Sequence, residues 1–223
     1  MDRNRISNNK YSISSFSYKI KTTIDYYFTI PSPGPEVLLK EKASKFFGYT
    51  FPIKNEDDLK TNLALLKKKH KNAGHFCYAF QLGIENSYFR VNDDGEPSNS
   101  AGLPIYGQIQ ASKTTNIFIV VVRYFGGTKL GVGGLIQAYK KTAKLAIEGS
   151  SIVKRPITRS LLLIFPYSEL NTIMRILKKH SLKIVQKQME EECNFKIEVL
   201  RSDLDLIFNL FSKLNKITCK KPA

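Results

Sequence analysis

Two short stretches of the sequence concentrate residue types that can do chemistry. The first, NDDGEPSNSAGLP at residues 92–104, carries the carboxylates of Asp93, Asp94 and Glu96. Carboxylate oxygens suit a hard cation such as Mg²⁺. The same stretch also fits a turn, because Asp-Gly and Glu-Pro are turn formers and the polar residues 98–100 can cap a following helix. A metal site and a structural turn both stay open.

The second stretch, RYFGGTKLGVGGL at residues 123–135, places five glycines directly after the apolar run 117–122. A strand, a glycine loop and a helix in this order can aim backbone N–H groups and the positive helix end at an anion. The spacing matches neither a Walker loop nor a dinucleotide-binding loop. Anion binding and a tight turn both stay open. The candidate anion-binding or nucleic-acid-binding residues are Arg123, Tyr124, Gly126, Gly127, Lys129, Gly131, Gly133 and Gly134.

The histidines and cysteines give no clear catalytic pattern. His75 and Cys77 face the same side of a strand, as a nucleophile and its base would, but a core cysteine beside a histidine at the sheet edge is the preferred interpretation. His70 and His180 end lysine-rich helices, which favours cations at helix C-termini. We therefore expect no catalytic residue, no resident metal and no cofactor.

Composition indicates the kind of partner and the compartment. The 223 residues contain 35 Lys and Arg against 19 Asp and Glu, which gives a formal charge of +16. This excess favours polyanions such as RNA or ribosomes, although lysine-covered helices alone would also produce it. The three cysteines show no metal-binding spacing, which favours a reducing compartment. Neither a bilayer-spanning run nor a signal peptide is present, so we expect a cytoplasmic protein without membrane contact.

These residues must be positioned by alternating strands and helices. Asn55 precedes three acidic residues and therefore predicts the start of a helix that ends in a basic run. The run at 117–122 predicts a buried strand. Strands are predicted at 36–42, 45–53, 75–82, 87–92 and 115–125, and helices at 55–71, 103–112 and 135–147.

The segment EGSSIVKRP at residues 148–156 predicts a domain boundary. Beyond it, the pattern predicts a βαββαβ unit of the ferredoxin-like class, with Ser168 and Ser202 capping its two helices. The fold class is α+β. The predicted division is a disordered basic tail at 1–30, an N-terminal domain at 31–150 and a C-terminal domain at 151–223. The Arg- and Ser-rich start of the tail would also fit a transit peptide or an extended gene start.

The two motifs, DDGEPSNSAGLP and VVVRYFGGTKLGVGGLIQAY, together resemble the signature of the YigZ/IMPACT family. The upstream His-x-Cys of that family is matched by His75 and Cys77, and Pro97 and Gly102 are further motif positions. The resemblance runs from about residue 37 to 145. The βαββαβ unit is similar to the second domain that bacterial members carry.

The resemblance implies an N-terminal domain like the second domain of ribosomal protein S5 and a C-terminal domain like the fifth domain of a translocation elongation factor. Both relatives touch RNA or the ribosome, whereas eukaryotic members restrain a translation-stress kinase through protein contacts. The resemblance thus implies a translation regulator that binds RNA or ribosomal particles without catalysis. Two alternatives stay open: an enzyme for phosphate esters or small molecules with a metal on the acidic loop, and a protein-interaction module. The sequence does not indicate the oligomeric state.

Overall fold

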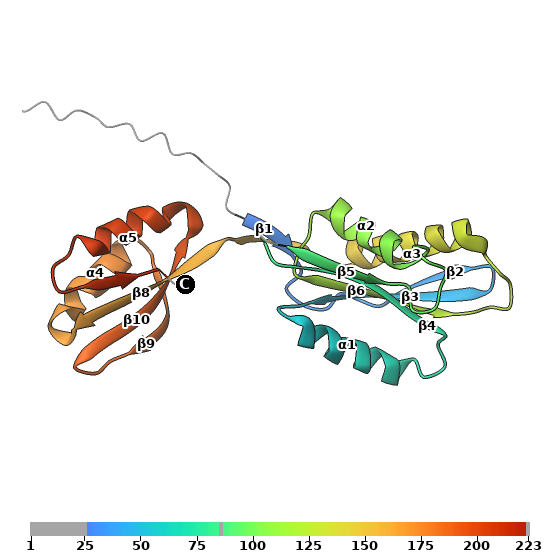
Figure 1. Cartoon of the computed structure of the whole chain (residues 1–223), viewed down its shortest axis with the longest axis horizontal. Helices are drawn as coiled ribbons and strands as arrows, with labels where there is room; N and C mark the ends of the chain where they lie inside the picture. The colour runs from blue at the N-terminus through green and yellow to red at the C-terminus, as the bar shows by residue number, and fades with distance from the viewer. Residues whose placement is uncertain (1–25, 85–86, 222–223) are drawn as a thin grey trace, which may run out of the picture.

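The structure is a computed structural model that describes residues 26–84 and 87–221 (Figure 1). Its strands form one five-stranded, one four-stranded and one two-stranded sheet, and helices pack on the two larger ones. The predicted mixed α+β class is therefore confirmed. Across the described ranges, no helix has the length and apolar character that a bilayer crossing needs. Residues 1–25, which carry most of the predicted basic tail, lie outside the described residues.

The five-stranded sheet has the order β2-β3-β6-β4-β5, and all neighbouring strands are antiparallel. β6 lies at its centre because residues 117–123 are all buried, as the apolar sequence predicts. The strands are β2 (Val37–Glu41), β3 (Ser44–Pro52), β4 (His75–Leu82), β5 (Tyr88–Asn92) and β6 (Ile117–Tyr124).

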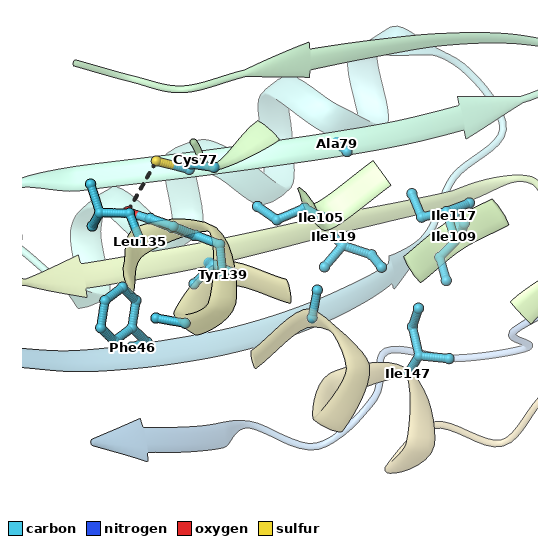
Figure 2. Packing of buried hydrophobic residues seen from close by; sticks show 14 of the residues in the cluster. Phe46, Cys77, Ala79, Ile105, Ile109, Ile117, Ile119, Leu135, Tyr139 and Ile147 are labelled. Carbon is cyan, nitrogen blue, oxygen red and sulfur yellow. Dashed lines mark hydrogen bonds between the residues drawn. The ribbon is translucent and has the colours of Figure 1, made fainter. Parts of the chain in front are cut away.

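Helices cover both faces of this sheet. α1 (Glu56–Lys69) lies on one face, and α2 (Gly102–Ser112) and α3 (Gly131–Glu148) lie on the other (Figure 1). Alternate residues of β6 enter the two cores: Ile119 packs with α2 and α3, as Figure 2 shows, and Val120 packs with α1.

The starts of α1 and α3 can be compared with the starts predicted from the sequence. The Asn55 side chain accepts hydrogen bonds from the backbone N–H groups of Asp57 and Asp58, so the predicted cap of α1 is confirmed. α3 begins at Gly131, four residues earlier than predicted, because the glycines 133 and 134 adopt helical backbone conformations. Part of the predicted glycine loop is therefore helix.

The four-stranded sheet has the order β11-β8-β10-β9, and its elements follow the predicted βαββαβ sequence. One hydrophobic cluster joins both helices to one face, with Phe165, Ile173 and Phe211 at its centre. The elements are β8 (Thr158–Pro166), α4 (Leu170–Lys179), β9 (Lys183–Gln188), β10 (Glu192–Leu200), α5 (Leu204–Ser212) and β11 (Thr218–Lys220).

The predicted serine caps of α4 and α5 are wrong. Ser168 and Ser202 each lie in a short 3₁₀ turn that leads into the helix. The residues at the helix N-caps are Glu169 and Asp203, and neither makes a side-chain capping hydrogen bond. The tighter turn moves the serines one position too early to accept from the first helical N–H groups.

A two-stranded ribbon was not predicted. β1 (Tyr26–Thr29) pairs antiparallel with β7 (Val153–Pro156), and Figure 1 shows the ribbon between the two larger sheets. Ile30 is only 2% exposed and joins the core under α2 and α3. The predicted tail over residues 1–30 therefore includes residues 26–30, which are part of the fold. The predicted linker 148–156 contains a strand. Long-range pairing, which no local composition reveals, explains both corrections. The division into two domains stays a prediction.

Candidate functional site

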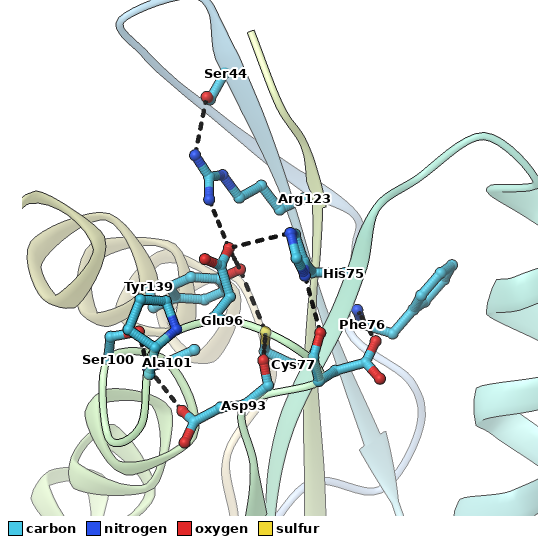
Figure 3. Close-up of polar contacts among 12 residues, drawn as sticks. Ser44, His75, Phe76, Cys77, Asp93, Glu96, Ser100, Ala101, Arg123 and Tyr139 are labelled. Atoms are coloured by element: carbon cyan, nitrogen blue, oxygen red, sulfur yellow. Dashed lines mark hydrogen bonds and ion pairs between the residues drawn. The ribbon is translucent and has the colours of Figure 1, made fainter. Parts of the chain in front are cut away.

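The acidic loop between β5 and α2 is held by its own carboxylates. Asp93 Oδ1 accepts from the backbone N–H groups of Ala101, at 3.0 Å, and Gly102, at 2.8 Å. Its Oδ2 accepts from the N–H of Asn99 at 2.9 Å. Asp93 therefore satisfies the first N–H groups of α2, a role that the sequence assigned to residues 98–100. Figure 3 shows this carboxylate next to Ala101.

Asp94 fixes the loop to the first residues of β4. Its Oδ2 accepts from the backbone N–H of Phe76 at 2.6 Å, and its carbonyl oxygen lies 2.8 Å from Nδ1 of His75. A carbonyl oxygen can only accept, so Nδ1 carries the proton in this contact. Nε2 of His75 is then directed toward Glu96, whose Oε1 lies 3.9 Å away (Figure 3).

Glu96 is the centre of the site. Its side chain is 4% exposed, and Oε1 accepts from Nη1 of Arg123 at 2.6 Å and from the hydroxyl of Tyr139 at 2.7 Å. A buried carboxylate needs such partners, because an isolated charge in an apolar core is strongly disfavoured. The three side chains come from the acidic loop, β6 and α3, so their contacts join those segments.

The guanidinium of Arg123 is enclosed as well. It lies between the rings of Phe46 and Phe125, with its centre 5.4 Å from each ring centroid. Nη2 lies 3.4 Å from Oγ of Ser44, whereas Nε is buried and has no hydrogen-bond partner among the described residues. Ion pairing and stacking together hold this side chain in one position.

Cys77 belongs to the same network but is not poised as a nucleophile. Its Sγ lies 2.9 Å from the carbonyl oxygen of Asp93 and 3.3 Å from the hydroxyl of Tyr139 (Figure 2). The side chain is fully buried, and this burial raises the pKa of the Cys77 thiol far above its usual range. A thiol held neutral is a poor nucleophile, so the geometry supports the core-cysteine interpretation.

In the structure, the carboxylates of Asp93, Asp94 and Glu96, the alternative metal site, do not converge on one point. The three carboxylates point to different protein donors: the start of α2, the backbone of β4, and the Arg123–Tyr139 pair. Within the part of the chain that is described, no group of three or more His, Cys, Asp or Glu side chains is placed to hold a metal ion. The turn at residues 93–96 aims the carboxylates apart.

The structure explains why glycine is required at three positions of the glycine loop. A Cβ on Gly126 would come far closer than 3.0 Å to the backbone of Ala43 and Ser44, so the loop packs directly on the β2–β3 turn. Gly127 and Gly131 have φ of +86° and +72°, which favour glycine. Gly133 has no such constraint, whereas a Cβ on Gly134 would lie 3.1 Å from Cβ of Leu130.

The predicted anion-contacting side chains do not all lie on one side of the sheet. Arg123 faces inward, and Tyr124 lies on the opposite face of the sheet, where its hydroxyl is 3.0 Å from Nδ1 of His70. Lys129 is exposed at the rim of a cavity of about 320 Å³ that Arg123, Phe125 and Val132 also line. Because adjacent strand residues face opposite ways, 123 and 124 cannot serve one site. Anion binding by the loop stays a prediction, in which Arg123 and Lys129 line one cavity and Tyr124 lies apart from them.

A groove between the β2–β3 hairpin and α3 was missed by the sequence reasoning. Its volume is about 500 Å³, and we name it the basic groove after Lys42, Lys140, Lys141 and Lys144, which line it. The repeat of lysines at 140, 141 and 144 was the available signal. Lys42 could not be added from the sequence, because only the fold brings it to α3.

His70 also departs from its predicted role. The imidazole is 6% exposed, with Nε2 2.5 Å from the hydroxyl of Tyr49 and Nδ1 3.0 Å from that of Tyr124. Tyr49 donates to Glu36, so Nε2–H donates to Tyr49 and Nδ1 accepts from Tyr124. Burial lowers the pKa of His70, with a smaller contribution from Lys69. The side chain is therefore a neutral bridge and not a helix-end cation.

This bridge makes stability depend on pH. As pH falls from 7 through 6.5 toward the lower folded-state pKa of His70, the unfolded chain gains a proton that the folded chain excludes. We therefore expect the unfolding free energy to fall, by at most about 1.4 kcal/mol per pH unit. Urea unfolding at pH 7.5 and 5.5 measures this. The His70→Gln variant should lose this part of the pH dependence; parallel curves for the two proteins would contradict the assignment.

The elements and the site define the protein's class: a mixed α+β protein whose acidic loop and glycine loop are joined by one buried Glu–Arg–Tyr network. The chain belongs to the IMPACT family, as the sequence motifs predicted. The family model described as the Impact N-terminal domain matches residues 42–147. The chain is 32% identical over 173 residues to the IMPACT family member YvyE of Bacillus subtilis (strain 168), which covers 78% of this chain and 79% of that protein.

Two further comparisons agree. The IMPACT family member YigZ of Escherichia coli (strain K12) is 28% identical over 163 residues, covering 72% of this chain and 80% of that protein. A crystal structure of a hypothetical protein matches with a TM-score of 0.67 and 22% identity, covering 90% of this chain and 98% of that one. The latter likeness shows a shared fold.

Proposed function

We propose that the protein is a cytoplasmic translation regulator that binds RNA or ribosomal particles and performs no covalent chemistry. The observation that carries this proposal is the charge of +16, which arises from 35 basic and 19 acidic residues. A protein with such an excess attracts polyanions over a range of several ångströms. The translation role is what membership of the IMPACT family implies.

The assignment of the two domains is part of the proposal. An N-terminal domain like the second domain of ribosomal protein S5 and a ferredoxin-like C-terminal domain are both compatible with the sheets described above. The strand order β11-β8-β10-β9 with two helices on one face supports the ferredoxin-like assignment. Both folds have relatives that touch RNA or the ribosome, as the motif resemblance implies.

The site geometry favours binding over catalysis. The carboxylates that a metal-dependent enzyme would use are occupied by protein donors, and the thiol of Cys77 is buried. These groups stabilise the junction of the acidic loop, β4, β6 and α3. The observations therefore give the enzyme alternative no specific support. The following experiment distinguishes RNA binding from a protein-interaction role.

RNA binding should depend steeply on salt. If about four to six phosphates are contacted, affinity should fall by about two orders of magnitude between 50 and 200 mM salt, because each contact releases condensed counterions. The measurement is a salt titration of binding to a structured RNA, beside co-sedimentation with ribosomes. A chain lacking residues 1–25 is tested in parallel. Absence of binding at 50 mM in both assays would favour the protein-interaction alternative.

A further inference from the structure

We infer that the basic groove is where the sugar-phosphate backbone of RNA binds. The inference rests on the proposed function and adds its location. One wall is the β2–β3 hairpin with Lys42, and the other is the solvent-facing side of α3 with Lys140, Lys141 and Lys144. Leu39 and Leu130 also line the groove, so apolar surface lies between the charges.

The helix dipole does not explain the positions of the lysines in α3. Basic residues in the last turn of a helix offset its dipole, and α1 follows this rule with Lys67, Lys68 and Lys69. α3 has no basic residue in its last turn, and its three lysines lie in mid-helix. The helix dipole therefore does not account for their positions, and all three line the groove.

The groove keeps most of its positive charge. Lys144 lies 3.6 Å from Glu148 in an exposed i,i+4 pair, and exposed pairs of this kind are weak because water screens the charges. Over the ranges 26–84 and 87–221, no carboxylate lies within ion-pair distance of Lys42, Lys140 or Lys141. Glu41 is the acidic side chain in the lining. The four lysines thus outnumber the two acidic residues beside them, Glu41 and Glu148.

The turn that presents Lys42 is strained. Lys42 and Ala43 both have positive φ, 43° and 65°, in the two-residue connection of the hairpin. Asn and Gly are the residues that such turns favour. Strained backbone clusters at active sites and ligand-binding sites. Here the task that we assign to Lys42 is contact with phosphate across from α3.

The spacing of the charges favours RNA over an acidic protein. Lys140 and Lys144 are one turn apart on one stripe of α3, about 6 Å along the helix axis, and Lys42 faces them. A nucleic-acid backbone offers repeated single charges that suit such a row. Protein partners are usually anchored by buried aromatic residues or arginine, and the groove is lined by neither.

The test compares two triple variants of equal charge change. Lys140→Gln, Lys141→Gln and Lys144→Gln neutralise the groove; Lys67→Gln, Lys68→Gln and Lys71→Gln remove exposed lysines of the α1 region, on the opposite face of the sheet. The probe is a labelled RNA hairpin in a salt titration, with folding checked by circular dichroism. The groove variant should bind at least 10-fold more weakly at 150 mM salt, with a log–log salt slope shallower by about 2 to 3. The control should stay within about 2-fold.

A second variant separates binding from stability. Lys42→Asn with Ala43→Gly relaxes the turn, so its melting temperature should rise while its RNA affinity falls about 3-fold or more. Unchanged affinity in both groove variants, or equal loss in groove and control variants, would overturn the groove assignment while the proposed function stands. Lack of RNA binding by the unaltered protein would remove both. If a polyglutamate peptide of equal charge binds as tightly as the RNA, the partner is an acidic protein and the RNA assignment is wrong.

Discussion

Replacing Gly126 by alanine should lower the unfolding free energy by about 3 kcal/mol. The added methyl group would overlap the backbone of Ala43 and the N atom of Ser44. These are main-chain atoms in and beside the β2–β3 ladder, so no side-chain rotation can relieve the overlap. The N–H of Gly126 also donates to Oγ of Ser44 at 3.1 Å, and a shift of the loop would break this bond. Denaturant unfolding measures the loss.

Gly133→Ala is the matched control within the same motif. No atom lies within 4 Å of the space that its Cβ would occupy, and the residue is part of α3. Alanine is the better helix former, so stability should stay unchanged or rise by up to about 1 kcal/mol. Similar stability for the two variants would show that the glycine loop does not pack tightly on the hairpin turn.

The elements predicted best from the sequence were those whose own residues decide their structure. β6 is apolar throughout, and α1 has a capping asparagine, an acidic first turn and a basic last turn. The ribbon of β1 and β7 was missed because its four-residue strands depend on pairing between Tyr26 and Pro156, residues that are remote in the sequence. Tertiary pairing of this kind leaves little local signal.

The candidate site was predicted as a set of segments but not as a geometry. The family signature contains the acidic loop, the glycine loop and the His-x-Cys strand, and the structure brings these segments together. The motifs could not show that Arg123 faces Glu96 while Tyr124 faces His70, because that depends on which face of β6 each residue takes. They also could not show the basic groove, since the fold alone brings Lys42 beside Lys141.

Replacing Arg123 by alanine should cost about 3–5 kcal/mol of unfolding free energy, because it leaves the carboxylate of Glu96 buried without a counter-charge. The Arg123 side chain is 6% exposed, so water cannot readily take its place. Tyr139 still donates to Glu96, but one neutral hydrogen bond does not replace an ion pair in an apolar core. The truncation also removes the side chain from between Phe46 and Phe125. Chemical unfolding at neutral pH measures the effect.

A second ion pair, between α1 and β5 of the five-stranded sheet, provides the control. Arg90 and Glu56 lie 3.1 Å apart but are 56% and 39% exposed, so Arg90→Ala should cost at most about 1 kcal/mol. In the core, Arg123→Met combined with Glu96→Gln removes both charges and should recover most of the loss, because the penalty comes from the unpaired charge. If Arg123→Ala costs no more than Arg90→Ala, the Glu96 network does not hold the two loops together. If Arg123→Ala lowers the unfolding free energy by the expected amount, weaker RNA binding by that variant reflects a damaged fold. Anion binding at the glycine loop is then tested with a substitution of the exposed Lys129.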